Sequence, residues 1–277
     1  MLLSDILMVP HGLGQKLEYL EGEGPKLEAV SDGAGLARLR TADFHEILAP
    51  VYQTVRRIAG ALPEGTALIG FAGSPWTVAC YMVQGGGSKE WEKVKGFAYR
   101  DQAGFDALIE LLVGVTVEYL SRQIEAGAEA VQLFDSWAGI LPASRFRRYV
   151  IEPTRKIVAA LKALHPDVPV IGFPRNCGVL IEEYTRKTGV DAVALDTTVC
   201  PVWAAQHVQP LRPVQGNLDP ILVMAGGEAM KTGTDEILRA LTNGPFVFNL
   251  GHGVTQGTPP EHVGQLAELI RDWPNRR

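Results

Sequence analysis

The sequence is poor in cysteine and contains no long apolar run. Its three cysteines, Cys80, Cys177 and Cys200, are far apart and form no CxxC or HxC pair. This odd, scattered set argues against a disulfide framework and against a zinc site. No stretch of about 18 apolar residues occurs, because two glutamates interrupt the longest candidate, residues 108–120. We therefore expect no membrane-spanning helix.

The chain also lacks an excess of basic residues. It has 26 Lys and Arg against 31 Asp and Glu, a net charge of −5, so it offers no positive field for a nucleic-acid partner. The N-terminal apolar run contains Asp5 and is preceded by no basic residue, so it does not form a secretory signal. These absences predict a cytoplasmic protein without nucleic-acid or membrane partners.

Short apolar runs alternate with helical stretches along the chain. The apolar runs are nearly continuous, which indicates strands of a parallel sheet covered on both faces. The predicted strands are residues 67–73, 129–137, 168–174, 190–197, 212–218 and 245–251. The predicted helices are residues 43–62, 103–128, 144–165, 180–189, 234–241 and 260–272. This alternation predicts repeated β/α units.

The repeated units favour an α/β fold, a (β/α)8 TIM barrel, in a single domain spanning residues 1–277. The chain is 46% apolar, enough for a large core, and contains no Pro/Ser-rich linker. A further strand predicted at residues 1–6 makes seven, one short of a closed barrel. We therefore expect a barrel that lacks its first β/α unit, with the chain truncated at its N-terminus. An open doubly wound sheet is the alternative, but no GxGxxG follows any strand.

Barrel enzymes carry their chemistry at the C-terminal ends of the strands. The polar residues that follow the predicted strands include Asp5, Asp135, Ser136, Arg175, Asn176, Asp196, Asn217, Asp219 and His252. Some have structural explanations, because Asp5 is suited to cap a turn and Asp219, just before Pro220, is predicted to be a helix N-cap. His252 lies between two glycines, where no core contact requires an imidazole.

The site is predicted to contain neither a metal ion nor an organic cofactor. The six histidines form no HxH, HxxxH or HxC group, and no strand end supplies the ligands that a catalytic metal requires. For chemistry, the sequence offers carboxylate, hydroxyl and imidazole groups around a glycine-rich, aromatic mouth.

Four long motifs closely resemble those of the uroporphyrinogen decarboxylase family. They are GFAGSPWTVACYMVQGGGSK (70–89), FDSWAG (134–139), QGNLDP (215–220), and FNLGHGV followed by TPPEHV (248–254 and 258–263). The SDIL segment that contains Asp5 and the GEGP segment (22–25) agree as well. The resemblance implies a cofactor-free homodimeric barrel that removes the four acetate carboxyl groups of uroporphyrinogen III, giving coproporphyrinogen III for haem and chlorophyll synthesis.

The resemblance also assigns roles to residues. The substrate-binding residues that it implies are Asp5, Phe71, Tyr81, Phe134, Ser136 and His252. Asp5 and Tyr81 match the catalytic pair, in which the aspartate accepts hydrogen bonds from pyrrole N–H groups and stabilises a protonated ring. The serine and the histidine match groups that contact substrate carboxylates, and the phenylalanines match apolar walls. Loss of CO2 from a pyrrole acetate requires an electron sink, and a fixed anion favours the cationic ring that provides it.

One part of the family pattern is missing from this sequence. An RQAGRY-type segment lies upstream of the SDIL strand in the family, and its arginines bind substrate carboxylates. An octa-anionic substrate requires guanidinium partners, so Arg175 and the pair Arg38 and Arg40 are the remaining candidates. We therefore hold three hypotheses: a decarboxylase whose chain starts further upstream, which we favour; a truncated paralogue that binds porphyrinogen or folds without turnover; and a methyltransferase of the same superfamily. The third requires zinc-binding Cys and His residues that this sequence lacks.

Overall fold

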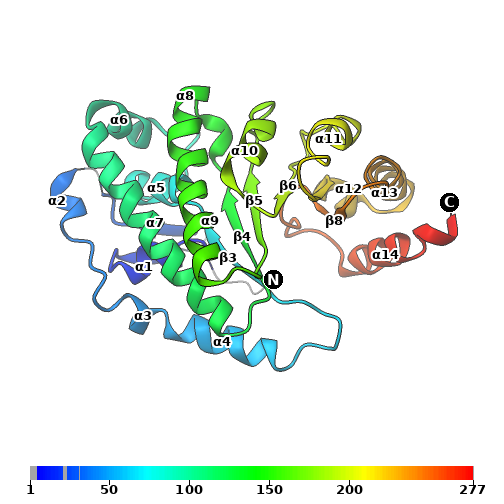
Figure 1. Ribbon diagram of the computed structural model, residues 1–277, viewed down its shortest axis with the longest axis horizontal. Helices are drawn as coiled ribbons and strands as arrows, with labels where there is room; N and C mark the ends of the chain where they lie inside the picture. The colour runs from blue at the N-terminus through cyan, green and yellow to red at the C-terminus, as the bar shows by residue number, and fades with distance from the viewer. Residues whose placement is uncertain (1–4, 21–23, 31, 277) are drawn as a thin grey trace.

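Six parallel strands form the main sheet of the protein. A computed structural model describes residues 5–20, 24–30 and 32–276, and within them the strand order β3-β4-β5-β6-β7-β8 follows the chain (Figure 1). The strands are β3 (Ile69–Gly73), β4 (Ala130–Asp135), β5 (Val170–Pro174), β6 (Ala192–Ala194), β7 (Val214–Leu218) and β8 (Phe246–Leu250). Sequential parallel order is that of a β/α barrel, and all six strands predicted between residues 67 and 251 are confirmed.

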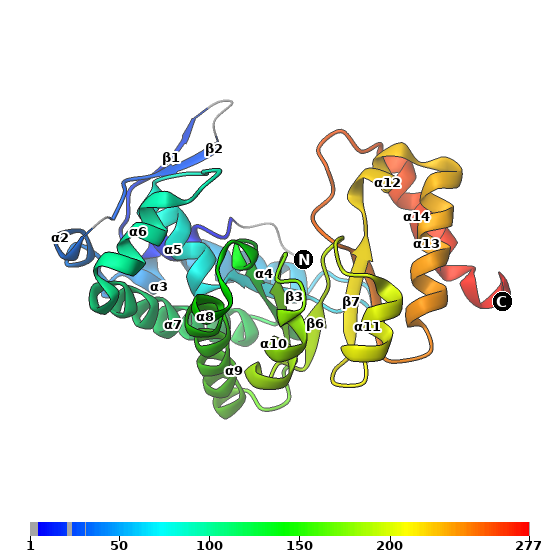
Figure 2. The same ribbon diagram turned by 90° about the horizontal axis from the view of Figure 1, so that it is seen from above.

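Helices connect successive strands of the main sheet, and others precede β3 or follow β8. In the first half of the chain they are α1 (Met8–Gly12), α2 (Gly33–Leu36), α3 (Phe44–Ile47), α4 (Ala49–Ala59), α5 (Pro75–Gln84), α6 (Glu92–Arg100) and α7 (Gln102–Glu125). In the second half they are α8 (Ala143–Phe146), α9 (Glu152–Leu164), α10 (Leu180–Thr188), α11 (Pro201–His207), α12 (Pro220–Ala225), α13 (Gly227–Leu241) and α14 (Pro260–Arg271). Helices α7 and α9 lie side by side over β3 and β4. Helices α11–α14 gather around β7 and β8 (Figure 2).

Two predicted helices are interrupted, and proline explains both interruptions. The helix predicted at residues 43–62 is divided at Leu48 into α3 and α4, and Pro50 occupies the first turn of α4. The helix predicted at residues 144–165 contains a π-helical segment, Arg147–Ile151, between α8 and α9. Pro153 follows that segment and has no N–H to donate to the preceding turn, so the backbone shifts its hydrogen-bond register there.

A hairpin near the N-terminus was not predicted. Strands β1 (Leu17–Leu20) and β2 (Gly24–Leu27) pair antiparallel. The end of the hairpin is joined to α5, because Leu27 N donates to Gly85 O at 3.0 Å. Gly85 ends α5 in the left-handed conformation (φ 83°), and a Cβ there would lie 3.1 Å from Leu27 O. The first glycine of the GGG run thus has a structural purpose.

The strand predicted at residues 1–6 is not present in its described part. Residues 1–4 lie outside the described residues, and Asp5 and Ile6 form the coil and turn that lead into α1. Leu7 N donates to Asp5 Oδ1 at 2.9 Å, so the Asp5 carboxylate caps a turn and the chain does not continue as a strand. Within the described residues the sheet therefore has six strands, where seven were predicted, and β8 does not pair with β3.

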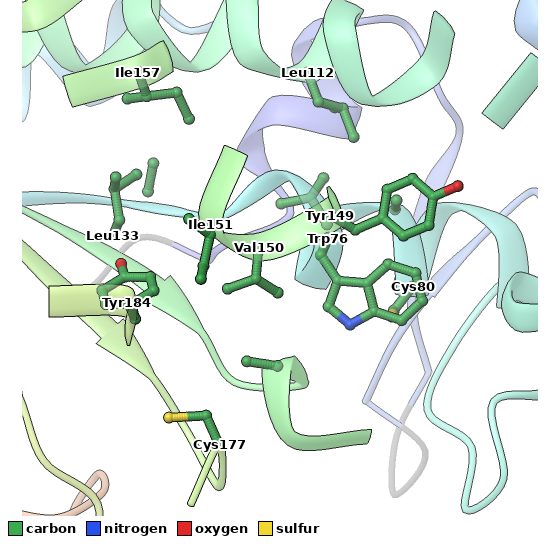
Figure 3. Close-up of a cluster of buried hydrophobic side chains, with 14 of the residues drawn as sticks. Trp76, Cys80, Leu112, Leu133, Tyr149, Val150, Ile151, Ile157, Cys177 and Tyr184 are labelled. Atoms are coloured by element: carbon green, nitrogen blue, oxygen red, sulfur yellow. The ribbon is translucent and has the colours of Figure 1, made fainter. Parts of the chain in front are cut away.

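The main core lies between the sheet and the helices, and Figure 3 shows part of it. Trp76 of α5 and Tyr149 of the π-helical segment stack at 5.9 Å with an interplanar angle of 16°. Phe105 of α7 meets both rings edge to face. All three side chains are almost fully buried. This aromatic cluster fixes α5 and α7 against the sheet, and burial of each ring contributes about 2–3 kcal/mol.

The strand register decides which side chains face the inside of the barrel. Alternate residues of a strand point to opposite faces, and residues paired across parallel strands share a face. The pairing produces two inward-facing layers, Phe71–Gln132–Ile171 and Gly73–Phe134–Phe173. The second layer lies nearer the C-terminal ends of the strands, where a barrel carries its site.

Candidate active site

A cavity of about 380 Å³ opens at the C-terminal ends of the strands. We call it the central cavity; its walls are Ile6, Phe71, Gln132, Phe134, Ser136, Phe173, Ala194, Gln215, Asn249, Leu250, His252, Gly253 and Val254. Four of the six residues predicted for the site lie in these walls, namely Phe71, Phe134, Ser136 and His252. They come from β3, from the end of β4 and from the loop after β8, so the fold brings together residues that are far apart in the sequence.

Three phenylalanines form the apolar side of the central cavity. Phe71 and Phe134 meet edge to face at 5.8 Å, and Phe134 and Phe173 meet in the same way at 5.7 Å. Phe71 and Phe173 are 6% and 5% exposed. Such a wall favours a ligand with an extended apolar face. Phe173 was not among the predicted site residues, and the pairing of β5 with β4 places it beside Phe134.

Two buried amides lie deeper in the same cavity. Gln132 of β4 and Gln215 of β7 are 2% and 3% exposed, and Gln215 Nε2 donates to Gln132 Oε1 at 3.3 Å. Both were missed by sequence reasoning. The available signal was a glutamine at an inward position of an otherwise apolar strand. The pair supplies hydrogen-bonding groups at the bottom of the cavity, opposite its open mouth.

His252 lies at the cavity mouth and can donate a hydrogen bond there. Gly253 N donates to His252 Nδ1 at 2.6 Å, so the neutral ring carries its proton on Nε2. Burial lowers the pKa of His252, the Arg175 guanidinium lowers it further, and the Asp196 carboxylate opposes them. At neutral pH the imidazole is therefore neutral, with Nε2–H available to an acceptor.

A second cavity of about 330 Å³, here the side cavity, shares a wall with the first. His252, Gly253 and Val254 line both, and Arg175, Thr197, Asp219, Pro220, Ile221 and Thr255 complete the side cavity. Arg175 follows β5 and is half-buried. Its side chain is the cationic group of these walls. A guanidinium that faces a cavity is suited to bind a carboxylate or a phosphate.

Two aspartates after the strands have structural roles. Asp219 Oδ1 accepts a hydrogen bond from Ile221 N at 2.9 Å, which confirms the predicted N-cap of α12. Asp196 is 2% exposed. Its carboxylate accepts from Asn176 N at 2.6 Å and from Thr198 N at 2.8 Å. The backbone of two loops occupies the Asp196 oxygens, so this residue holds the loops together.

Asp5 and Tyr81 lie outside the walls of both cavities. Asp5 adjoins Ile6, which lines the central cavity, and Tyr81 lies on α5 with its ring 6.4 Å from that of Trp137. Burial raises the pKa of Tyr81; the charge of Asp5 also raises it and that of Arg175 lowers it. The structure therefore brings Asp5 and Arg175 within electrostatic reach of the Tyr81 hydroxyl, beside the cavity rim.

The other arginine candidates are not brought to the site. Neither Arg38 nor Arg40 lines the central or the side cavity. The Arg38 guanidinium is exposed and lies 3.7 Å from the Glu28 carboxylate. Of the three arginines proposed as carboxylate partners, Arg175 is the one that the fold places at the mouth.

Among the described residues, no group of three or more His, Cys, Asp or Glu side chains is arranged to hold a metal ion. None of the helices in the described parts of the chain combines the length and the apolar character needed to cross a membrane. The three cysteines are free.

Sequence comparison finds close relatives along almost the whole chain. Residues 1–273 match the family model for uroporphyrinogen decarboxylase. A uroporphyrinogen decarboxylase of Rhodospirillum rubrum is 50% identical over 270 residues, covering 98% of this chain and 78% of the relative. One of Gluconobacter oxydans is 51% identical over 273 residues, with coverage of 98% and 77%. One of Paracoccus denitrificans is 50% identical over 271 residues, with coverage of 98% and 79%.

Comparison of structures finds the same architecture in distant proteins. A methyltransferase from Methanosarcina mazei superposes with a TM-score of 0.83 at 14% identity, covering 98% of this chain and 79% of that one. A B12-independent methionine synthase from a Shewanella species superposes with a TM-score of 0.55 at 9% identity, with coverage of 95% and 76%. At such identities the similarity establishes the fold alone.

Proposed function

The chain belongs to the uroporphyrinogen decarboxylase family, and from that premise we propose that it converts uroporphyrinogen III into coproporphyrinogen III by removing its four acetate carboxyl groups. This is a carboxy-lyase reaction of haem and tetrapyrrole biosynthesis. The observation that supports it most directly is the central cavity, in whose walls Phe71, Phe134, Ser136 and His252 converge at the strand ends. The aromatic side matches the apolar face of a macrocycle, and the polar mouth matches its carboxylates.

The chemistry requires a proton donor, an electron sink and an anion that stabilises the intermediate. A proton added to a pyrrole carbon makes the ring cationic. The electron pair of the breaking C–C bond then flows into the ring as CO2 leaves, the exocyclic methylene takes up a proton to become a methyl group, and the ring carbon returns its proton. We assign the Asp5 carboxylate to the cationic ring, because a fixed anion lowers the free energy of that state more than that of the neutral substrate.

Tyr81 is assigned to the proton transfers and hydrogen bonding beside the reacting acetate. Burial raises the pKa of its hydroxyl, so Tyr81 stays protonated near neutral pH and acts as a donor. The charges of Asp5 and Arg175 both act on this hydroxyl, which supports its assignment beside the reacting acetate.

The substrate carboxylates require donors, and three side chains are assigned to them. Ser136 and the Nε2–H of His252 lie at the central cavity, and Arg175 lies at the side cavity. Since His252 lines both cavities, we assign the central cavity to the ring and the side cavity to a carboxylate arm. The guanidinium binds a carboxylate with two hydrogen bonds, and the neutral imidazole donates one.

Residues 1–277 are proposed to form one barrel domain, which acts as a homodimer in the cytoplasm and uses no cofactor. The family resemblance supports these assignments. The second hypothesis, a paralogue that binds porphyrinogen without turnover, involves the same cavities and differs only in chemistry. An activity measurement therefore separates the two.

The Asp5→Asn variant tests the catalytic assignment. Asn Oδ1 can still accept the hydrogen bond from Leu7 N, so the turn before α1 is retained while the negative charge is removed. We expect the chain to decarboxylate uroporphyrinogen III under anaerobic conditions and Asp5→Asn to lose about 100-fold or more in kcat. Products are separated by their number of carboxyl groups, and thermal unfolding checks that both proteins are folded. Turnover that is unchanged in Asp5→Asn would reduce Asp5 to a turn cap, and a folded wild type without turnover would favour the non-catalytic paralogue.

A further inference from the structure

A buried chain of hydrogen bonds joins the end of β4 to the start of α5. Thr77 Oγ1 donates to Asp135 Oδ1 at 2.6 Å, and Trp137 N donates to Thr77 Oγ1 at 3.0 Å. Trp76 Nε1 donates to Trp137 O at 2.9 Å. Asp135, Thr77 and Trp76 are at most 1% exposed. We call these four residues, Trp76, Thr77, Asp135 and Trp137, the β4–α5 clamp.

When Asp135 is ionised, the available protons fix the direction of these hydrogen bonds. A threonine hydroxyl has one proton, and Thr77 gives it to Asp135, so a lone pair of the same oxygen faces Trp137 N–H. The second carboxyl oxygen, Asp135 Oδ2, is buried and has no hydrogen-bond partner among the described residues. An apolar pair would fill this space without leaving a polar atom unpaired. Core stability alone therefore does not explain the carboxyl group.

The clamp lies directly behind the candidate site. Ser136 stands between Asp135 and Trp137 and faces the central cavity. Tyr81 follows Thr77 by one helical turn on α5, and its ring contacts that of Trp137 edge to face at 6.4 Å. The Asp135 carbonyl also accepts from Arg175 N at 3.1 Å. The positions of Ser136, Tyr81 and Arg175 thus depend on one buried linkage.

We propose that Asp135 and Thr77 are positioning residues, which hold Ser136 and Tyr81 in the geometry that a polycarboxylated tetrapyrrole requires. The identity of that ligand rests on the proposed function. Burial raises the pKa of Asp135 to about 7, and the hydrogen bond from Thr77 opposes the increase. Neither side chain lines the cavity, so both act through the backbone of residues 136–137 and through α5.

Thr77→Val is the first test, because valine has the shape of threonine and no hydroxyl. We expect its kcat for uroporphyrinogen III to fall by about tenfold or more while thermal unfolding remains cooperative. Thr77→Ser restores the hydroxyl and should retain kcat within about threefold of wild type. Thr234→Val is the matched control, since Thr234 is equally buried but bonds only to Met230 O of its own helix, α13. Its kcat should equal that of wild type.

Two further measurements do not depend on turnover. Hydrogen exchange of the Trp137 amide should be slow in wild type, Thr77→Ser and Thr234→Val, and at least about tenfold faster in Thr77→Val, which lacks the acceptor. Fluorescence titration with uroporphyrin, the oxidised form of the substrate, should show weaker binding by Thr77→Val than by Thr234→Val. Thr77→Ala provides a second variant should Thr77→Val fail to fold. Alanine also lacks the hydroxyl that donates to Asp135 and accepts from Trp137 N, so we expect the same losses.

The outcomes separate this proposal from the proposed function. A wild type that binds uroporphyrin without turnover would refute the decarboxylase assignment, while binding and exchange still test the clamp. Wild-type kcat and binding in both Thr77→Val and Thr77→Ala would overturn the positioning role. A loss of kcat that serine does not rescue would do the same, because it would show that the hydroxyl is not the group that matters.

Discussion

At the scale of single residues, the polar groups after the strands hold backbone, line a cavity, or do both. Asp196 accepts hydrogen bonds from loop N–H groups, and Asp219 caps α12 while it also lines the side cavity. Ser136, Arg175 and His252 line the cavities. Asp5 caps a turn and adjoins a cavity wall residue as well. For Asp5, therefore, only a substitution that keeps the turn cap can separate a chemical role from the structural one.

His252→Gln tests the carboxylate contact. The neutral imidazole donates from Nε2, and glutamine does not hold an N–H at the same point because its own backbone contact with Gly253 is lost. One hydrogen bond to a charged group contributes about 1.5–3 kcal/mol, so we expect KM to rise by about tenfold or more with a smaller change in kcat. His207→Gln, on the exposed face of α11, serves as the control and should match wild type. An unchanged KM would remove His252 from the binding assignment.

The buried carboxyl of Asp135 predicts a pH-dependent stability. Its pKa is about 7 in the folded protein against an ordinary 3.8, so the native state binds the proton more tightly than the unfolded chain. The stabilisation from this proton is complete below about pH 4 and is lost as the pH rises through about 7. From pH 5 to pH 8 wild type should lose about 2–3 kcal/mol relative to Asp135→Asn. Urea unfolding of both proteins at each pH measures the difference, and a constant difference would contradict the prediction.

At the scale of elements, the six strands of the main sheet followed from the sequence, whereas the β1–β2 hairpin and the irregular connections did not. The inner strands are continuous apolar runs, for which burial on both faces leaves few alternatives. The β1–β2 hairpin was missed because four-residue strands with charged members carry little periodicity. The split at Leu48 and the π-helical turn before Pro153 depend on single backbone hydrogen bonds. The amphipathic pattern of a helix does not show where a single backbone hydrogen bond is missing.

The candidate site likewise combines residues that sequence motifs predict with residues that meet only in the folded protein. Phe71, Phe134, Ser136 and His252 were predicted from motifs and lie in the cavity wall. Phe173 joins them through the pairing of β5 with β4, a register that the sequence pattern alone does not give. The clamp was not recoverable, because a threonine on α5 and an aspartate on β4 meet only after the helix has docked.

Gly73→Ala should disturb the approach of the N-terminal segment to β3. A Cβ at Gly73 would lie 2.8 Å from Val78 Cγ2 and 3.2 Å from Ile6 Cβ, so either α5 or the segment with Asp5 and Ile6 must move. We expect a loss of about 1–3 kcal/mol of stability together with reduced turnover. Gly264→Ala is the control, because a Cβ at that position of α14 meets nothing within 4 Å. Equal behaviour of the two variants would show that Gly73 is not a point of close approach.

At the scale of the whole molecule, the described sheet ends in two strands that have a partner on one side only. β3 pairs with β4 and β8 pairs with β7, and no pairing between β8 and β3 joins them in the described residues. The inward-facing Val247 of β8 is 53% exposed, although its register partner Gln215 is buried. Edge strands and exposed apolar side chains favour association with another polypeptide chain.

If the protein is a homodimer, its molecular mass and its thermal midpoint should depend on protein concentration. Sedimentation equilibrium should show twice the mass of one chain at micromolar concentration. The thermal midpoint should rise with protein concentration, since association stabilises the folded subunit by mass action. Denatured protein under the same optics calibrates the single-chain mass. A single-chain mass at every concentration would refute the dimer while leaving the active-site proposals in place.

The alternation of β4 makes that strand unusually intolerant of insertions and deletions. Gln132, Phe134 and Ser136 point into the cavity, while Asp135 points to Thr77. Each face can accept substitutions one position at a time. A single residue added or removed within the strand, however, would carry the carboxylate into the cavity and the serine into the helix layer, exchanging the two sets at once. Point mutations in β4 can therefore change the chemistry of the central cavity, whereas a change in the length of β4 disrupts both faces of the strand.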